Sequence, residues 1–160
     1  GLANRRAIDA HLAELAEKGE PRVIALCDID HFKSVNDRYG HGVGDRVIKL
    51  VASTLEDACT AQFVGRWGGE EFIVIMPSSD IAAVIKRLNQ ARQTLADTKF
   101  KLRETDEPMG PITFSAGVAV NSETSDETLR RADNALYEAK KAGRNTVLIA
   151  PESGRVADAA

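Results

Sequence analysis

Two short, uninterrupted apolar runs constrain the fold of this chain more than any other feature. Residues 23–27 and 72–76 are apolar at every position. Strands of this kind are covered on both faces, whereas a strand with one solvated face alternates apolar and polar residues. Each run is far shorter than the ~20 residues that a bilayer-spanning helix needs. The two runs therefore predict a central sheet with helices on both sides.

Segments with helical spacing, separated by turn signals, place the remaining elements around that sheet. We expect helices over residues 4–18, 32–39, 80–95 and 125–142, and one more helix that begins at its cap, Asp45. We expect strands over residues 22–30, 63–67, 70–76, 112–120 and 146–150, and an edge hairpin or a loop over residues 99–111. The alternation predicts an α/β fold with a mixed central sheet of about five strands flanked by helices. Residues 1–150 form the expected domain, and residues 151–160 a disordered C-terminal tail.

The composition limits the partners and the compartment of the protein. Its 160 residues include 21 Lys and Arg against 24 Asp and Glu, which gives a net charge of −3. This mildly acidic balance argues against binding to nucleic acid or to a membrane surface. Cys27 and Cys59 are too few for a disulfide framework and are expected to be reduced packing residues. Because no charged-then-apolar leader opens the chain, we expect a soluble, cytoplasmic domain.

An acidic pair, Asp28 and Asp30, stands at the carboxyl end of the first buried strand. Residues i and i+2 of a strand point to the same face, so the two carboxylates could share a divalent cation. Alternatively, Asp30 caps the helix that begins near Phe32, while Asp28 is merely solvated. The spacing alone leaves both interpretations open.

A glycine pair followed by two acids marks the second apolar strand. Gly68 and Gly69 predict a two-residue hairpin turn, whose backbone a phosphate group or a second protomer can approach. Glu70 and Glu71 alternate between faces, so they are expected to serve different roles. A plain hairpin would explain the glycines, but it would not explain two acids at the start of an apolar strand.

Cations near the end of the last predicted helix form a third cluster, which contains Lys140, Lys141 and Arg144. The helix macrodipole by itself favours cations at this end, so a solvated helix terminus explains them equally well. Acids that hold a divalent cation, an accessible backbone and distal cations would together suit a nucleoside triphosphate.

Four ordered blocks of this sequence resemble those of the GGDEF family, the diguanylate cyclases. The predicted hairpin carries the family signature as Gly68-Gly69-Glu70-Glu71-Phe72. The other matching blocks are Gly1-Leu2 with Asn4-Arg5-Arg6, then Asp28-Ile29-Asp30-His31-Phe32-Lys33 with Asn36-Asp37, Gly40-His41 and Gly44-Asp45, and finally Arg131-Ala132-Asp133, Tyr137, Ala139-Lys140 and Gly143-Arg144-Asn145. The resemblance covers nearly all of residues 1–149.

The resemblance implies a nucleotidyl-cyclase-like fold, similar to the palm of adenylyl cyclases and polymerases, with a β-hairpin that carries the signature. It implies an enzyme that condenses two GTP molecules into cyclic di-GMP and two pyrophosphates. Asp28, Glu70 and the Ile29 carbonyl would bind Mg²⁺, for which Mn²⁺ could substitute. Glu71 would position or deprotonate the attacking 3′-hydroxyl and contact a second metal ion. Because one domain binds one GTP, the reaction would require a homodimer in which two domains face each other.

The same resemblance implies a set of substrate contacts. Asn36 and Asp45 would bond the guanine edge, because a carboxylate suits the N1–H and N2–H₂ donors that adenine lacks. The set implied for the triphosphate comprises the backbone of His31, Phe32 and Lys33, the turn glycines Gly68 and Gly69, and the side chains of Lys140 and Arg144.

One departure from the family pattern concerns regulation. Many members carry Arg-x-x-Asp just before the signature, and this motif binds product and inhibits the enzyme. The corresponding stretch here is Cys59-Thr60-Ala61-Gln62, so we predict no product inhibition through that site. Since the opening block starts midway, we expect an upstream sensory or dimerisation domain. We therefore expect the isolated domain to be largely monomeric and weakly active.

Two alternative functions lie within the same family framework. A catalytically silent GGDEF module would bind GTP or cyclic di-GMP to regulate a partner, but such modules usually lose the metal-binding or signature acids. Asp28, Glu70 and Glu71 are all present here. A relative that makes an adenine-containing dinucleotide is disfavoured by Asp45. The sequence therefore favours a GTP-specific cyclase.

Overall fold

A computed structural model describes residues 2–60, 62–103, 105, 107–120 and 124–152 of the chain. The helices in these ranges are α1 Arg5–Lys18, α2 Phe32–Tyr39, α3 His41–Ala58, α4 Ile81–Asp97 and α5 Ser125–Lys141. The strands are β1 Val23–Ile29, β2 Phe63–Arg66, β3 Glu71–Met76, β4 Phe114–Val120 and β5 Val147–Ile149. The predicted alternation of helices and strands is confirmed.

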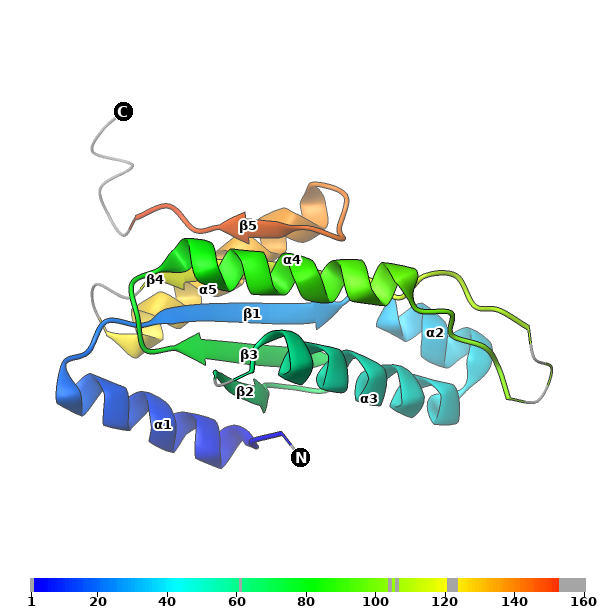
Figure 1. The fold of residues 1–160 in the computed structure, drawn as a ribbon, viewed down its shortest axis with the longest axis horizontal. Coiled ribbons are helices and arrows are strands. Elements are labelled where there is room, and N and C mark those ends of the chain that lie inside the picture. The colour runs from blue at the N-terminus through cyan, green and yellow to red at the C-terminus, as the bar shows by residue number, and fades with distance from the viewer. Residues whose placement is uncertain (1, 61, 104, 106, 121–123, 153–160) are drawn as a thin grey trace.

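The five strands form one mixed sheet in the order β2-β3-β1-β4-β5 (Figure 1). The central strand β1 pairs antiparallel with β3 on one side and with β4 on the other. Only the pairing of β4 with β5 is parallel within the described sheet. Asp28 of β1 lies opposite Glu71 of β3, so the register brings an acid of the first cluster beside the signature hairpin.

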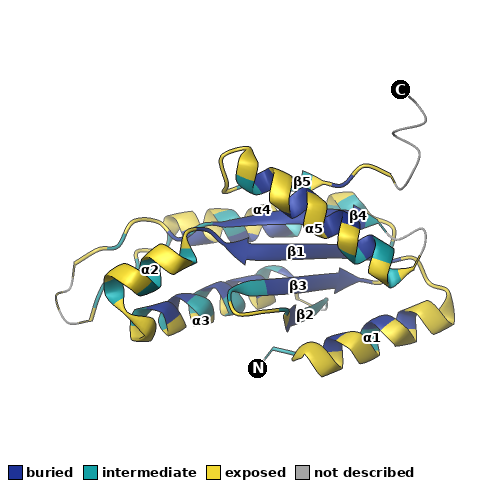
Figure 2. Cartoon of the chain, turned by 180° about the vertical axis from the view of Figure 1, so that it is seen from behind, coloured by how far each residue is buried: buried dark blue, intermediate teal, exposed yellow. Residues whose placement is uncertain are grey.

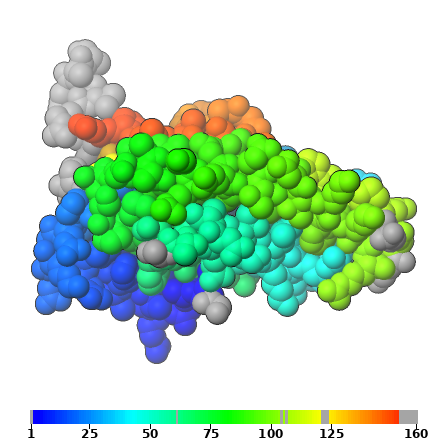
Figure 3. Space-filling view, in the orientation of Figure 1, coloured from blue at the N-terminus to red at the C-terminus, as the bar shows by residue number. Residues whose placement is uncertain are grey.

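Helices cover both faces of the sheet, as the apolar runs predict. Every residue of β1 is buried, and its side chains alternate between two apolar cores. One core lies under α3 and α4, and the other lies under α1 and α5. Figure 2 shows the buried strands between helices whose outer faces are exposed, and in Figure 3 the atoms of α3 and α4, in teal and green, cover much of the face toward the viewer.

Gly117 sets how closely α5 approaches the sheet. A Cβ atom at this position of β4 would lie 2.1 Å from the Ala132 carbonyl oxygen and 2.3 Å from the Leu136 nitrogen. Both atoms belong to the backbone of α5, which cannot yield as a flexible side chain does. Glycine therefore lets the α5 backbone rest directly on β4.

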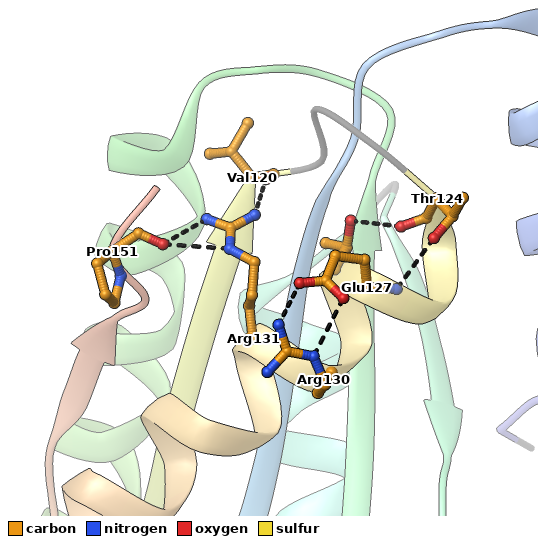
Figure 4. A network of polar contacts seen from close by, with 7 residues as sticks. Val120, Thr124, Glu127, Arg130, Arg131 and Pro151 are labelled. Atoms are coloured by element: carbon orange, nitrogen blue, oxygen red, sulfur yellow. Dashed lines mark hydrogen bonds and ion pairs between the residues drawn. The ribbon is translucent and has the colours of Figure 1, made fainter. Parts of the chain in front are cut away.

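Arg131 fastens the end of the sheet on the same side (Figure 4). Its buried guanidinium donates to the carbonyl oxygen of Val120 at 2.8 Å and to that of Pro151 at 2.8 and 3.1 Å. Nearby, the Thr124 hydroxyl caps α5 by accepting from the Glu127 nitrogen at 3.2 Å, and Glu127 pairs with Arg130. These contacts fix the end of β4 and the second residue after β5 to α5.

Some expectations from the sequence need correction, and one falls mostly outside the described residues. Asp45 does not cap a helix, because Gly40 adopts a positive φ of 89° and turns the chain directly into α3 at His41. The alternative of a hairpin is favoured over residues 99–111, where Lys101 bridges Pro108. The predicted tail lies outside the described residues from 153 onward. No helix in the described part of the chain is long and apolar enough to span a bilayer.

Both cysteines have the packing role that was predicted from the sequence. Cys27 and Cys59 are buried free thiols. Burial raises the pKa of the Cys59 thiol to about 11, and it raises the pKa of Cys27 further still. Neither thiol is therefore ionised at neutral pH.

Candidate active site

Asp28 is the buried acid around which the site is built. It is the sixth residue of the wholly buried β1 and is itself only 7% exposed. The Lys140 ammonium of α5 lies 2.9 Å from its Oδ2 atom, across 112 residues of sequence. Burial raises the pKa of Asp28, and the Lys140 hydrogen bond and charge oppose that rise. The sequence alternative of a solvated Asp28 is therefore wrong.

The signature hairpin turns over three residues rather than the two predicted from the glycine pair. Arg66 pairs with Phe72, and the Trp67 nitrogen donates to the Glu71 carbonyl at 2.8 Å, so Glu70 belongs to the turn. The Ile29 nitrogen also donates to the Glu70 carbonyl at 3.1 Å. The turn is thereby fixed against the end of β1.

Arg66 holds this turn from within. Its Nε and Nη2 atoms donate to the Gly69 carbonyl oxygen at 3.1 and 2.6 Å, and Nε also donates to that of Gly68 at 3.2 Å. A glycine-rich turn is otherwise conformationally free. The Arg66 guanidinium therefore fixes the backbone conformation of the turn, which the glycines alone would leave variable.

Three carboxylates influence one another where β1, the turn and β3 meet. Burial is the main cause of a raised pKa for Glu71, and the negative charge of Asp28 adds to it. Glu70 also raises the pKa of both of these acids through its charge. Lys140 acts in the opposite direction on both. These three acids and Lys140, here called the acidic unit, are therefore coupled through their charges, and Asp133 also raises the pKa of Glu71 as Asp30 does that of Asp28.

This unit has the donor chemistry that a hard divalent cation requires. Mg²⁺ and Mn²⁺ favour carboxylate and carbonyl oxygen, and the Lys140 ammonium already lies where positive charge lowers the cost of burying Asp28. Among the residues that the structure describes, no three acid, histidine or cysteine side chains stand close enough to form a complete metal cluster. The oxygen donors of the predicted ligands Asp28, Glu70 and Glu71 are of the type that such an ion binds. Their role as ligands stays a prediction.

Asp30 has neither of the roles that the sequence left open. Its Oδ2 accepts from the Thr113 hydroxyl at 2.7 Å and from the Asn145 nitrogen at 2.9 Å, and its Oδ1 accepts from the Ser115 hydroxyl at 2.7 Å. The chain has left β1 at Ile29, so the two aspartates no longer share a strand face. The α2 N-cap is His31, which makes no side-chain cap bond. Asp30 is thus neither a shared metal ligand nor a helix cap.

The predicted guanine contacts lie on α2 and α3. The Oδ1 atom of Asn36 is buried and has no hydrogen-bond partner in the described part of the chain. It faces Gly44, where a Cβ atom would come within 1.9 Å of it. Asp45, next to this glycine, is exposed and lines a groove of about 730 Å³. A buried acceptor without a donor costs free energy unless a ligand satisfies it, so this oxygen is a candidate ligand contact, and the guanine role of Asn36 stays a prediction.

The predicted phosphate contacts differ in how the structure presents them. His31 adopts a left-handed φ of 57° ahead of α2, and no side chain caps the first turn, which includes Phe32 and Lys33. The Lys33 side chain is 90% exposed and pairs with Asp37. Arg144 is exposed at a φ of 67°, and the described residues give its guanidinium no hydrogen bond or ion pair. Lys140 alone of these cations contacts the acidic unit.

Comparisons with known proteins identify the family. The family model described as "Diguanylate cyclase, GGDEF domain" matches residues 1–146. Diguanylate cyclase VdcA from Vibrio cholerae serotype O1 is 36% identical over 151 residues, which are 92% of this chain and 44% of VdcA. The chain spans less than half the length of the curated relatives it matches first.

Solved structures show the same architecture. The GGDEF domain of DgcB from Caulobacter crescentus, in complex with c-di-GMP, superposes with a TM-score of 0.87 and 41% identity, over 92% of this chain and 91% of that one. A structure of the coiled coil and GGDEF domain of the same protein, also with c-di-GMP, gives 0.88 and 40% identity, over 93% of this chain and 82% of that one.

Proposed function

The chain belongs to the GGDEF domain family, and from this premise we propose that it is a diguanylate cyclase domain that condenses two GTP molecules into cyclic di-GMP. The observation that carries the proposal is the unit of Asp28, Glu70 and Glu71 with Lys140 at the end of β1. A silent binding module would not need Asp28 and Glu71 held together, where burial and the charge of neighbouring acids raise the pKa of both.

Asp28, the Ile29 carbonyl, Glu70 and Glu71 would hold Mg²⁺, or Mn²⁺ in its place. The chemistry that such a cation supplies is polarisation of the α-phosphate and activation of the attacking hydroxyl. Glu71, whose pKa is raised by burial, is suited to accept the proton of the 3′-hydroxyl. When Mg²⁺ and GTP are both bound, the Lys140 ammonium would leave Asp28 and pair with the triphosphate instead. It already lies beside the acids.

The triphosphate would lie along the start of α2. The backbone of His31, Phe32 and Lys33 forms an uncapped helix start, where backbone N–H groups and the helix dipole favour phosphate. The turn glycines Gly68 and Gly69 leave room for it beside the acids. Arg144, free of a protein partner in the described chain, would neutralise the leaving pyrophosphate.

Asn36 and Asp45 would select guanine. The unpartnered Asn36 Oδ1 and the Asp45 carboxylate are both acceptors, and guanine offers two donor groups on its N1 and N2 atoms. An Asp45→Ser variant should lose much of the preference for GTP over ATP in competitive binding. Unchanged discrimination would refute the role of Asp45.

Catalysis would require a homodimer, because one site holds one GTP and the 3′-hydroxyl of each must meet the α-phosphate of the other. A dimerising or sensory segment would bring two such domains together, as a coiled coil accompanies the GGDEF domain in the DgcB structure. We place the reaction in the cytoplasm, where GTP is available.

Product analysis tests the proposal. The chain is incubated at high concentration with GTP and Mg²⁺, beside a control that combines Glu70→Ala with Glu71→Ala. Cyclic di-GMP from the native chain alone would support the reaction and its assignment to these acids. If GTP binds without product, a leucine zipper fused ahead of residue 1 distinguishes the remaining cases. A fusion that still makes no product would favour a binding module and refute the cyclase.

A further inference from the structure

A left-handed loop joins α5 to β5 and carries Arg144. Gly143, Arg144 and Asn145 have φ values of 115°, 67° and 45°, so three consecutive residues occupy a region that L side chains rarely adopt. Such a backbone persists only where its surroundings hold it. The contacts of this loop therefore indicate what its shape is for.

Two side chains hold Asn145 from different elements. The Asp30 Oδ2 atom, just beyond the end of β1, accepts a hydrogen bond from the Asn145 backbone nitrogen at 2.9 Å. From α4, Arg92 donates through Nε to the Asn145 side-chain oxygen at 3.2 Å and through Nη2 to its carbonyl oxygen at 2.7 Å. The loop is thus fixed on both sides of the residue that follows Arg144.

Asp30 is equipped for this task rather than for ligand binding. It is 7% exposed, and both of its oxygens are occupied by the Thr113 hydroxyl, the Ser115 hydroxyl and the Asn145 nitrogen. The two hydroxyl contacts tie Asp30 to β4 and the residue just before it. The carboxylate therefore links β1, β4 and the loop at one buried point.

From this geometry we infer that Asp30 and Arg92 are positioning residues for Arg144. Together with the hydrogen bond from the Arg144 nitrogen to the Ala139 carbonyl oxygen at 3.1 Å, they hold its backbone in the left-handed conformation, so that a guanidinium without a protein partner in the described chain is presented to the triphosphate. The inference rests on the phosphate role of Arg144 proposed above. The ligand that Arg144 would bind is a nucleoside polyphosphate. Asp30 and Arg92, called the clamp from here on, would affect contacts to its phosphates and not to its base.

The test compares affinities for 3′-deoxy-GTP, which cannot react, with those for GMP, by calorimetry in the presence of Mg²⁺. Arg144→Ala should weaken 3′-deoxy-GTP about tenfold and leave GMP within about twofold. Asp30→Ala and Arg92→Ala should each weaken 3′-deoxy-GTP about three- to tenfold, again sparing GMP. Combined with Arg144→Ala, each should add less than about twofold, because residues that act through one group are not additive.

Matched variants separate the clamp from general damage. Arg87→Ala removes another α4 arginine, which donates instead to the Ala58 carbonyl at 3.2 Å, and should change neither affinity. Asp30→Asn should keep both affinities within about threefold. Its amide oxygen can still accept from Asn145, and its amide hydrogens can donate to Ser115. If Asp30→Ala does not fold, Arg92→Ala and Asp30→Asn carry the test.

A second measurement reads the clamp without any nucleotide. The Asn145 amide should exchange its hydrogen at least about tenfold faster in Arg92→Ala than in the native chain, and at the native rate in Arg87→Ala. Unchanged exchange, or equal weakening of GMP and 3′-deoxy-GTP, overturns the positioning role. Failure of Arg144→Ala to weaken 3′-deoxy-GTP instead overturns the proposed phosphate contact, and the inference falls with it.

Discussion

Replacing Gly44 by alanine should remove guanine recognition while leaving the fold intact. The new Cβ atom would lie 1.9 Å from Asn36 Oδ1, 3.0 Å from Asn36 Cγ and 3.2 Å from Phe32 Cζ. The nearest atom is the end of a flexible side chain, so Asn36 can turn away without moving the backbone. Gly44 lies in α3 with an ordinary helical φ, where alanine is favoured by up to ~1 kcal/mol. The free energy of unfolding should therefore change by less than ~1 kcal/mol.

The loss of function can be worked from the displaced acceptor. Without Asn36 Oδ1, a buried guanine donor loses its partner, which costs about 1–3 kcal/mol. Since each 1.4 kcal/mol corresponds to tenfold in affinity, GTP binding should weaken about 5- to 150-fold. ATP lacks that donor, so its weak binding should change little.

The assay measures GTP and ATP affinities by calorimetry and stability by urea unfolding on the same samples. Gly42→Ala is the matched control, because it lies in the same helix and nothing stands within 4 Å of its added Cβ. It should leave the affinity for GTP unchanged. The reasoning is refuted if Gly44→Ala keeps the native preference for GTP over ATP, or if Gly42→Ala loses it equally.

Three further predictions concern the acids and the product. The pKa of Asp28 is raised on folding, chiefly by burial, so its carboxyl favours the fold at low pH and this contribution is lost as the pH rises through the raised value. Asp28→Asn should therefore raise Tm at pH 7 and give no gain near pH 3, which thermal unfolding at both pH values checks, and an equal gain at both would contradict the reasoning. Because burial also raises the pKa of Glu71, protons should compete with Mg²⁺ and weaken metal-dependent GTP binding as the pH falls. Calorimetry from pH 8 to pH 5 checks this, and an equally steep decline in Glu71→Gln would contradict it. Added cyclic di-GMP should not inhibit turnover through the site that would contain Cys59 and Gln62, since Cys59 is a buried thiol. Strong inhibition that Gln62→Ala relieves would show this expectation to be wrong.

Local patterns in the sequence predict most of the fold. Uninterrupted apolar runs identify β1 and β3, because burial on both faces leaves a direct mark on each strand. Helical spacing locates α1, α2, α4 and α5 nearly at their observed bounds. The error at Asp45 arises because a single glycine with positive φ joins α2 to α3, whereas the pattern suggested a longer break.

The contacts that organise the site could not be predicted in the same way. Asp30 and Asn145 are 115 residues apart, and no local period links two residues at such a distance. Arg66 donates to backbone carbonyl groups of the turn. Every residue type has such a group, so the sequence does not mark this contact. Gly44 resembles any other glycine until the position of Asn36 is known. The sequence therefore predicts which residues carry the chemistry, and the structure shows which residues contact them.

The direct contact between α5 and β4 at Gly117 has a consequence for control. Lys140 belongs to α5, and Asp28 belongs to β1, the immediate neighbour of β4 in the sheet. At Gly117 the helix backbone lies directly against the strand, while around it α5 packs on the sheet through the apolar core that contains Leu136, Ile24 and Leu26. The backbone contact at Gly117 therefore helps to set the spacing between α5, which carries Lys140, and the sheet, which carries Asp28. If the chain acts as the proposed cyclase, we expect a control signal to change how two domains meet rather than to break the contact between Lys140 and Asp28.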